Sequence, residues 1–343
     1  MKKHMVLVKL FCLFACLQSA AFGNELKYCA EGVPHEIKNP LHSNWWGKEI
    51  FVKPVMESLV EIDSKTKEVG PMLADEWQVN SDQTEFTISL RKDVKFHSLN
   101  GKGAKEFEAD DVLSTFNSLF ENNQLGEAEI RERIKARGFN SLSQLSKLEK
   151  LDSYTVRFRF DSPQPTFLSE LSNPALSIQS SQYLELLRQG RKDVLPVGTG
   201  QWKVSEFEPS VGVKYEAFTE HWRGNAPFNS MKVQGITDPY ARANGLASGD
   251  CDVIYLHPNQ RNLLDAVAGE ITILPDQFIA ANKNLLCYGA DSKLGNLASV
   301  CLPNAANLSS KDQCPKCPKS GACPQSVLAA RQQCCPKSGS CGQ

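Results

Sequence analysis

An α/β fold is predicted by strand and helix patterns that alternate along the middle of this chain. Residues 85–90 and 154–160 alternate apolar with polar side chains, which is typical of strands with one buried face. Between them, the apolar side chains of Val112, Phe116 and Phe120 recur at helical spacing. Strands and helices in alternation predict a sheet with helices packed against it.

The first of these helices has acidic residues at its expected start. Glu108, Asp110 and Asp111 lie where the positive end of the helix dipole favours negative charge. The apolar stripe that follows, which also includes Leu119, is interpreted as a core-facing surface rather than a cofactor site.

A later helix is predicted between Asp238 and Gly249. Asp238 can cap its first turn, Pro239 suits the first helical position, and Gly249 can end it in the left-handed conformation. The pattern then predicts a strand at 251–256, a helix at 258–269 and a short strand at 271–274.

The length of the chain and its net charge limit the number of lobes and the kinds of partner that are expected. The chain has 343 residues, of which 41% are hydrophobic, and a single core seldom grows beyond about 250–300 residues. Two lobes are therefore expected. With 38 Lys and Arg against 39 Asp and Glu, the formal charge is −1, so we expect neither nucleic acid nor an anionic membrane surface as a partner.

The first 23 residues are typical of a signal peptide. Lys2 and Lys3 precede an apolar run at 5–17, and the small residues Ala21 and Gly23 suit cleavage before Asn24. Export to the periplasm is therefore expected. The alternatives are a membrane anchor, for which the run is shorter than the roughly 20 residues required, and a lipoprotein acylated at Cys16.

The twelve cysteines divide by position. Cys12 and Cys16 belong to the expected signal peptide, Cys29 and Cys251 stand alone, and the other eight lie from Cys287 onward. Helical and strand patterns fade after about residue 279, and residues 317–323 recur as a near-copy at 335–341.

The tail admits three interpretations. Zinc could bind through thiolates at Cys314, Cys317 and the cysteines that follow; the cysteines could form a small disulfide knot; or the segment could be a foreign sequence that does not fold. No metal site is assigned.

Several motifs are specific enough to indicate a family. They lie at residues 71–77 (PMLADEW), 86–97 (FTISLRKDVKFH), 107–112 (FEADDV) and 197–203 (VGTGQWK). Together they resemble the periplasmic dipeptide and oligopeptide binding proteins, which are family 5 of the extracellular solute-binding proteins. The Asn-Pro-x-Tyr-Trp pattern common in that family is retained here only as His221-Trp222.

The resemblance implies a mixed-sheet lobe of the type II periplasmic-binding-protein fold. On this basis we expect a first lobe with a smaller subdomain at 24–276, a divergent Cys-rich tail at 277–343, and a second lobe that is largely missing. Residues 28–32 (YCAEG) and 248–252 (SGDCD) resemble the dipeptide-binding subgroup. In that subgroup the two cysteines pair, which implies a Cys29–Cys251 disulfide; two buried free thiols are the alternative.

The family resemblance also implies a function. Members capture short peptides between two lobes and deliver them to the membrane permease subunits of an ABC importer. The first lobe contributes a loop after its first strand, so Ser43 and Asn44 are expected to bind ligand backbone, and Trp45 and Trp46 to provide an apolar wall. Packing of the two tryptophans beneath the loop is the alternative. A monomer without a cofactor is expected.

An enzyme is not expected. His97 lies within a matched motif and is interpreted as structural, and His42, His221 and His257 have no Cys, Asp or Glu at ligand spacing in the sequence. No Gly-x-Ser-x-Gly motif is present. Nickel, haem and oligosaccharide binders share the fold, so the fold alone does not fix the ligand. The alternative functions are a non-transporting interaction protein and an inactive truncated binding protein.

Overall fold

The computed structural model describes residues 25–33, 37, 40, 51–63, 66–99, 101, 103–121, 125–191, 193–226, 228–257, 259, 260, 262 and 263, and the backbone of four later strands between residues 271 and 303. The expected signal peptide, the loop at 41–47 and most of the tail lie outside these residues. Within the described part, no helix combines the length and apolar character needed to cross a bilayer.

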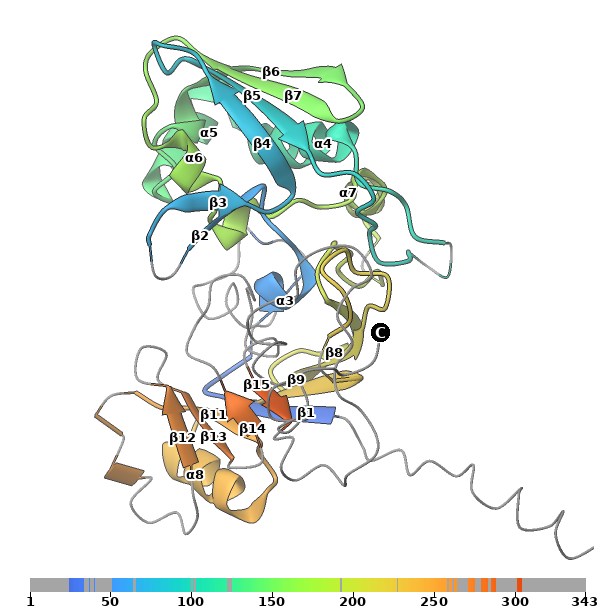
Figure 1. The fold of residues 1–343 in the computed structure, drawn as a ribbon, viewed down its shortest axis with the longest axis vertical. Coiled ribbons are helices and arrows are strands. Elements are labelled where there is room, and N and C mark those ends of the chain that lie inside the picture. Colours follow the sequence, from blue (N-terminus) through green and yellow to red (C-terminus); the bar gives the residue numbers. More distant parts are fainter. Residues whose placement is uncertain are drawn as a thin grey trace, which may run out of the picture.

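The larger subdomain is built on a seven-stranded mixed sheet, in the order β12-β13-β11-β1-β10-β9-β8 (Figure 1). Strand β1 lies parallel to both β10 and β11, and the other pairs are antiparallel. The strands are β1 (Glu25–Ala30), β8 (Trp202–Glu208), β9 (Gly212–Ala217), β10 (Ser230–Gly235), β11 (Val253–Tyr255), β12 (Ile271–Leu274) and β13 (Ile279–Asn282). Strands β14 (Leu285–Cys287) and β15 (Cys301–Pro303) form a separate pair.

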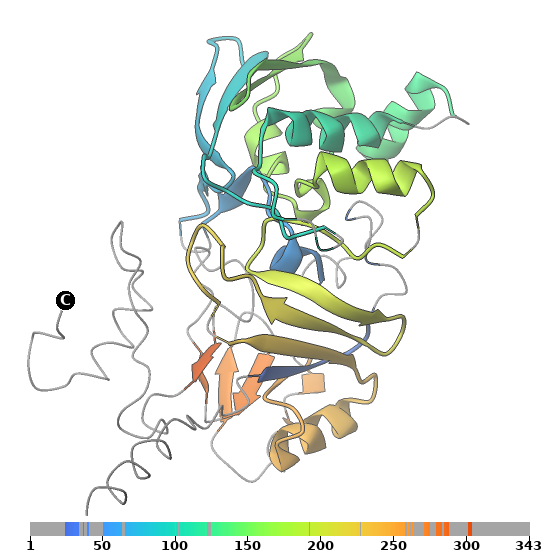
Figure 2. The same cartoon turned by 90° about the vertical axis from the view of Figure 1, so that its right-hand side faces the viewer.

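The smaller subdomain contains a four-stranded antiparallel sheet, in the order β4-β5-β7-β6, with helices on one side (Figure 2). The predicted strands at 85–90 and 154–160 are β5 and β7 at its centre. Its elements are β2 (Val60–Ile62), β3 (Val69–Pro71), β4 (Ala74–Val79), β5 (Glu85–Leu90), α4 (Ala109–Phe120), α5 (Glu127–Ala136), η3 (Leu142–Gln144), β6 (Leu145–Asp152), β7 (Thr155–Phe160), α6 (Phe167–Glu170), η4 (Pro174–Leu176) and α7 (Ser181–Arg188).

Helix α4 forms where its apolar spacing predicted it. Val112 and Phe116 are fully buried in the core of the smaller subdomain, which confirms the stripe as structural. The buried carboxylate of Asp111 accepts hydrogen bonds from the Glu108 N–H (3.1 Å) and the Ser181 N–H (2.8 Å). It thereby joins the start of α4 to the start of α7.

Helix α8 (Pro239–Ser248) confirms the local signals read from the sequence. Asp238 accepts a hydrogen bond from the Tyr240 N–H at 2.9 Å, and Gly249 ends the helix with φ of 82°. Strand β11 is shorter than the expected 251–256, because the Cys251 N–H bonds to Gly245 O on the helix and belongs to the turn. The expected helix at 258–269 lies mostly outside the described residues, and β12 is the expected strand at 271–274.

Candidate functional site

The carboxyl ends of the parallel strands β10, β1 and β11 meet at one edge of the larger sheet. In open α/β sheets, ligands bind outside the carboxyl ends of the strands, where neighbouring strands lead their chains apart. Here Glu31 follows β1, Ile236 follows β10, and His257 follows β11. This set of strand ends is called the carboxyl edge.

A half-exposed acid and imidazole face one another at the carboxyl edge. His257 Nε2 lies 3.2 Å from Glu31 Oε2, and the two side chains are 44% and 35% exposed. The Tyr255 hydroxyl lies 3.5 Å from His257 Nδ1, with the two rings edge-on at 5.2 Å. Burial, and then the negative charge of Glu31, raise the pKa of Tyr255. The phenol therefore stays protonated near neutral pH and remains a donor.

Arg242, on α8, holds the strand ends on both sides of β1. Its Nε donates to Tyr255 O at 2.8 Å, and its Nη1 donates to Thr237 O at 2.9 Å and also to Ile236 O. The side chain is fully buried, and Nη2 has no hydrogen-bond partner among the residues that the structure describes. Burial lowers the pKa of Arg242, while the charge of Glu31 opposes that shift.

The chemistry available at the carboxyl edge is that of recognition. A carboxylate, an imidazole and a phenol can accept or donate hydrogen bonds to a polar ligand. Across the described ranges, no group of three His, Cys, Asp or Glu side chains is arranged to hold a metal ion. Nothing in this arrangement supplies an activated nucleophile.

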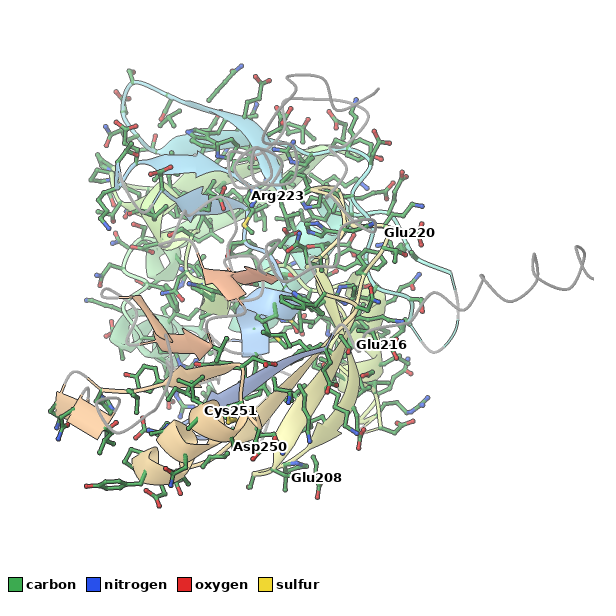
Figure 3. The ribbon with its side chains drawn as sticks, turned by 60° about the horizontal axis from the view of Figure 1, so that its bottom comes forward. Glu208, Glu216, Glu220, Arg223, Asp250 and Cys251 are labelled. Carbon is green, nitrogen blue, oxygen red and sulfur yellow. A yellow bond between two sulfur atoms is a disulfide. The ribbon has the colours of Figure 1, made fainter. Side chains whose placement is uncertain are left out.

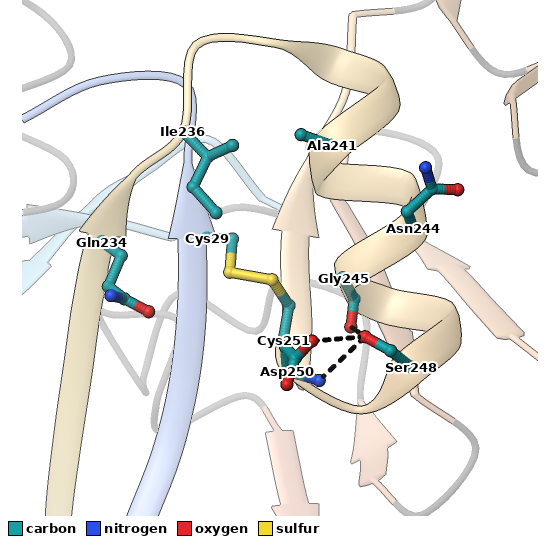
Figure 4. Close-up of a pocket in the computed structure, with 9 residues that line it drawn as sticks. All are labelled: Cys29, Gln234, Ile236, Ala241, Asn244, Gly245, Ser248, Asp250 and Cys251. Carbon is teal, nitrogen blue, oxygen red and sulfur yellow. Dashed lines mark hydrogen bonds between the residues drawn. A yellow bond between two sulfur atoms is a disulfide. The ribbon is translucent and has the colours of Figure 1, made fainter.

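The Cys29–Cys251 disulfide is present on the sheet face that α8 covers. Its S–S distance is 1.97 Å and its Cα atoms are 5.8 Å apart. It lies beside an open pocket of about 430 Å³ between β10, β1 and α8 (Figure 4). Gln234 and Asn244 contribute amides to the pocket wall, and the Ser248 hydroxyl donates to Asp250 at 2.7 Å. The disulfide links β1 to the turn that leads into β11.

A second polar cluster lies where the chain passes between the subdomains. The first crossing (56–59) enters the smaller subdomain, and the second crossing (194–201) leaves it. Glu57, on the first crossing, is buried, and its carboxylate accepts hydrogen bonds from Thr199 Oγ1 at 2.8 Å and Trp222 Nε1 at 2.9 Å. His221 Nε2 lies 3.2 Å from the other oxygen. We call Glu57, Thr199, His221 and Trp222 the Glu57 junction.

The loop between β9 and β10 carries the Glu57 junction into contact with the smaller subdomain. Arg223 pairs with Glu61 at 2.9 Å, and the guanidinium groups of Arg91 and Arg223 lie over the Trp222 ring at 4.3 and 4.4 Å. In Figure 3, Arg223 and Glu220 lie towards the smaller subdomain, whereas Cys251 lies at the end of α8. The retained His221-Trp222 motif therefore serves subdomain contact.

His97 holds the second crossing from the side of the smaller subdomain. Its backbone N–H donates to Gly198 O at 2.8 Å, and its ring Nε2 lies 2.8 Å from Gly200 O. The Gly198 N–H points at ring Nδ1 at 3.4 Å, so the proton resides on Nε2. Burial lowers the pKa of His97 to about 4, and the hydrogen bond to Gly200 O, which acts to raise the pKa, only partly offsets this. A neutral, buried imidazole fits the structural role expected from the sequence.

Acid is expected to destabilise the protein through His97. The unfolded imidazole takes up a proton near pH 6.5 but the folded one only near pH 4, so between these values the unfolded state binds more protons. The free energy of unfolding should therefore fall as pH falls, by up to ~3 kcal/mol from this group. Urea unfolding across this range would measure it. In His97→Gln, which keeps a donor for Gly200 O, the free energy of unfolding should depend less steeply on pH. An equal pH dependence in the variant and the wild type would show that His97 is not the titrating group.

Comparison with known protein families identifies the family to which the chain belongs. The model of the family "Bacterial extracellular solute-binding proteins, family 5 Middle" matches residues 68–277. The chain belongs to this family. The matched segment contains the smaller subdomain from β3 onward, the second crossing and strands β8 to β12.

Two curated members and one solved structure illustrate the similarity. Di/tripeptide-binding protein 1 of Pseudomonas aeruginosa (strain UCBPP-PA14) is 29% identical over 285 residues, covering 80% of this chain and 52% of that protein. The dipeptide-binding protein of Escherichia coli (strain K12) is 30% identical over 248 residues, covering 69% and 45%. The dipeptide-binding protein of Pseudoalteromonas sp. SM9913, in complex with Met-Leu, superposes with a TM-score of 0.64 at 24% identity, covering 72% and 50%.

These comparisons establish the fold class expected from the sequence. The described chain is a mixed α/β lobe of the periplasmic-binding-protein type, and it spans about half the length of the relatives it matches. Strand β13 pairs with β11 within the same sheet, so that sheet extends past residue 276. The division into 24–276 and 277–343 remains a prediction.

The sequence-predicted ligand residues fall outside the part of the chain that the structure describes. Ser43, Asn44, Trp45 and Trp46 belong to the loop at 41–47, which is not among the described residues, so their role stays a prediction. His221 and His257 have no acidic residue at ligand spacing in the sequence, yet each lies beside a carboxylate in the structure. His221 meets Glu57 and His257 meets Glu31, because folding brings together residues far apart in sequence.

Proposed function

We propose that this chain is the periplasmic substrate-binding component of an ABC importer that captures short peptides, with dipeptides and tripeptides as the preferred class. The observation that carries the proposal is the carboxyl edge, where Glu31 and His257 are half-exposed at the ends of parallel strands. The similarity to di/tripeptide-binding proteins of Pseudomonas aeruginosa supports the choice of ligand.

The polar groups at the carboxyl edge suit an extended peptide. The Glu31 carboxylate can accept hydrogen bonds from a backbone N–H or an α-ammonium group, and charge-assisted hydrogen bonds of this kind are strong. His257 and Tyr255 orient that carboxylate, and Arg242 fixes the strand ends that carry them. In this proposal, Ser43 and Asn44 add hydrogen bonds to the ligand backbone and Trp45 and Trp46 form an apolar wall.

The transport context belongs to the same proposal. Residues 1–23 act as a signal peptide, the mature chain works in the periplasm as a monomer, and its membrane partners are the permease subunits of the importer. Family 5 proteins bind solutes, so no catalytic residue is assigned.

The test is a peptide titration of the chain from Asn24 to Gln343. Thermal unfolding is followed with a dipeptide and tripeptide library, and with haem as a separate arm, since the similar Haemophilus influenzae protein is named Heme-binding protein A. A ligand that binds only the folded state must raise the unfolding midpoint. An upward shift with peptides is expected. A cooperative transition that no peptide shifts would overturn the proposal and favour a scaffold that docks another protein.

Replacing Glu31 tests the site itself. Glu31→Gln keeps the size of the side chain but removes the charge, and is expected to weaken peptide binding about tenfold, or ~1.4 kcal/mol. Titration calorimetry measures the change. Glu129→Gln is the matched control, because Glu129 lies on α5 and pairs only locally with Arg133. Equal affinity of the two variants would exclude Glu31 from the binding site.

A further inference from the structure

The covalent link between the two subdomains consists of the two crossings, and hydrogen bonds made by Glu57 and His97 hold these crossings in place. The Gly200 N–H of the second crossing donates to Val55 O beside the first crossing at 2.9 Å. The side-chain bond from Thr199 to Glu57 joins the crossings a second time. Relative motion of the subdomains would have to break both contacts.

The Glu57 carboxylate is suited to this position only in its ionised form. Three donors, from Thr199, Trp222 and His221, converge on its two oxygens. A protonated carboxyl would place a hydrogen among these three donors and lose acceptor capacity, so at least one contact would be left unmade. Each donor comes from a different place, namely the second crossing and two positions in the β9–β10 loop.

Two histidines lie at the same place, and the hydrogen bonds of His97 are satisfied only when its ring is neutral. His221 Nδ1 accepts from the Arg223 N–H at 3.2 Å, which assigns the ring proton to Nε2, facing Glu57. His97 has the same tautomer, with Nδ1 facing the Gly198 N–H. A second proton on the His97 ring would oppose the Gly198 N–H. Acid therefore acts on Glu57 and on His97 in the same direction.

The charges around Glu57 favour its ionised form at neutral pH. The titratable and charged groups that face the cluster are His221 and Arg223 from the β9–β10 loop, His97 from the smaller subdomain, Glu61 from β2 and Lys203 from β8. Burial raises the pKa of Glu57, but His221, Arg223 and the Trp222 indole outweigh burial, and the pKa lies below its ordinary value. The contacts form at neutral pH and become unstable only in acid.

We propose that Glu57 is an acid-released lock between the two subdomains: its ionised carboxylate ties the first crossing, the second crossing and the β9–β10 loop together, and its protonation frees them. Below the release pH, the crossings open while the core of each subdomain stays folded. The proposal is independent of ligand binding, because none of these residues lies at the carboxyl edge.

Hydrogen exchange read by NMR tests the lock. The reporters are the amides of Gly200 and His97, whose bonds to Val55 O and Gly198 O hold the second crossing. The references are the central strand amides of β5 and β10. Between about pH 7 and about pH 3.5, the protection factors of the reporters are expected to fall at least about tenfold more than those of the references. Equal losses in reporters and references would mean global unfolding and overturn the proposal.

A variant assigns the effect to Glu57. Glu57→Gln has the size of the protonated side chain, and its reporters at neutral pH are expected to exchange as the wild type does in acid. Glu170→Gln is the matched control, since Glu170 also accepts several hydrogen bonds, from the Ser141 and Leu142 N–H groups, but wholly inside the smaller subdomain. Normal reporter protection in Glu57→Gln would overturn the assignment.

A milder variant keeps the test decisive if Glu57→Gln does not fold. Thr199→Val preserves shape and removes one of the three donors to Glu57. Its reporters should lose protection at a higher pH than those of the wild type, and the Trp222 indole N–H signal should shift at the same pH. An unchanged midpoint for both signals would contradict the lock.

Discussion

Among substitutions of the described glycines by alanine, Gly198→Ala is expected to lower the free energy of unfolding most. A Cβ atom at Gly198 would lie 2.0 Å from Val55 O and 2.8 Å from Val55 C and Met56 Cγ. Most of these neighbours are backbone atoms of Val55, so the second crossing would have to move away from Val55 and the start of the first crossing. Overpacking commonly costs about 1–3 kcal/mol, and here the displacement would also break the bonds to His97, so a loss of at least about 3 kcal/mol is expected.

Urea unfolding at neutral pH would measure this loss. Gly103→Ala is the matched control, because a Cβ at Gly103 meets no atom within 4 Å and its φ is outside the left-handed region. Its stability should stay within about 0.5 kcal/mol of the wild type. Equal midpoints for the two variants would mean that the second crossing is not in backbone contact with Val55. Gly200→Ala, whose Cβ would lie 2.4 Å from Pro54 O, should also lose stability, but less than Gly198→Ala.

The close approach of Gly198 to Val55 gives a physical reason for the glycines in the family motif at 197–203. The pattern at 197–203 indicated a family, but a string of residues does not say which backbone lies beside it. Val55 is far from Gly198 along the chain, and only the fold brings the two together. The same holds for Glu57 and His221, which are 164 positions apart and were therefore not connected by any sequence spacing.

Elements with local signals were predictable. Asp238 and Gly249 delimit α8 because a cap and a left-handed residue act within one helical turn. The central strands β5 and β7 alternate because one of their faces is buried, as Phe86 and Phe158 show. Strand order depends on pairings between distant segments, so the placement of β1 between β10 and β11 could not be derived from periodicity.

The candidate site was predictable only in part. Glu31 lies within the string YCAEG at residues 28–32, yet nothing in that string singles it out. Its importance comes from the parallel pairing of β1 with β11, which brings His257 to the same edge. Arg242 was part of a predicted helix, and its hydrogen bonds to three strand-end carbonyls follow from how α8 packs.

Removing the disulfide with the double substitution Cys29→Ala and Cys251→Ala is also expected to lower the free energy of unfolding by a large amount. The bond closes a loop with a sequence separation of 222, and the chain-entropy relation gives about 5 kcal/mol for a loop of this length. Strand β11 is short and pairs with β1 at only two positions, Tyr28 with Val253 and Cys29 with Ile254. Without the disulfide, only these two residue pairs hold β11 against β1, and this pairing places His257 at the carboxyl edge. A loss of about 3–5 kcal/mol is expected in urea unfolding.

A reductant provides the matching experiment. Treating the wild type with a thiol reductant under unfolding conditions should lower its midpoint to that of the double variant, because both remove the same constraint on the unfolded chain. The double variant should not respond to the reductant through this bond, so any shift that persists in it would come from other cysteines. If the oxidised wild type and the double variant unfolded at the same urea concentration, the disulfide would not stabilise the sheet. The short β11–β1 pairing would then suffice to hold the carboxyl edge, and variants of Glu31 and His257 would be the more informative probes of that edge.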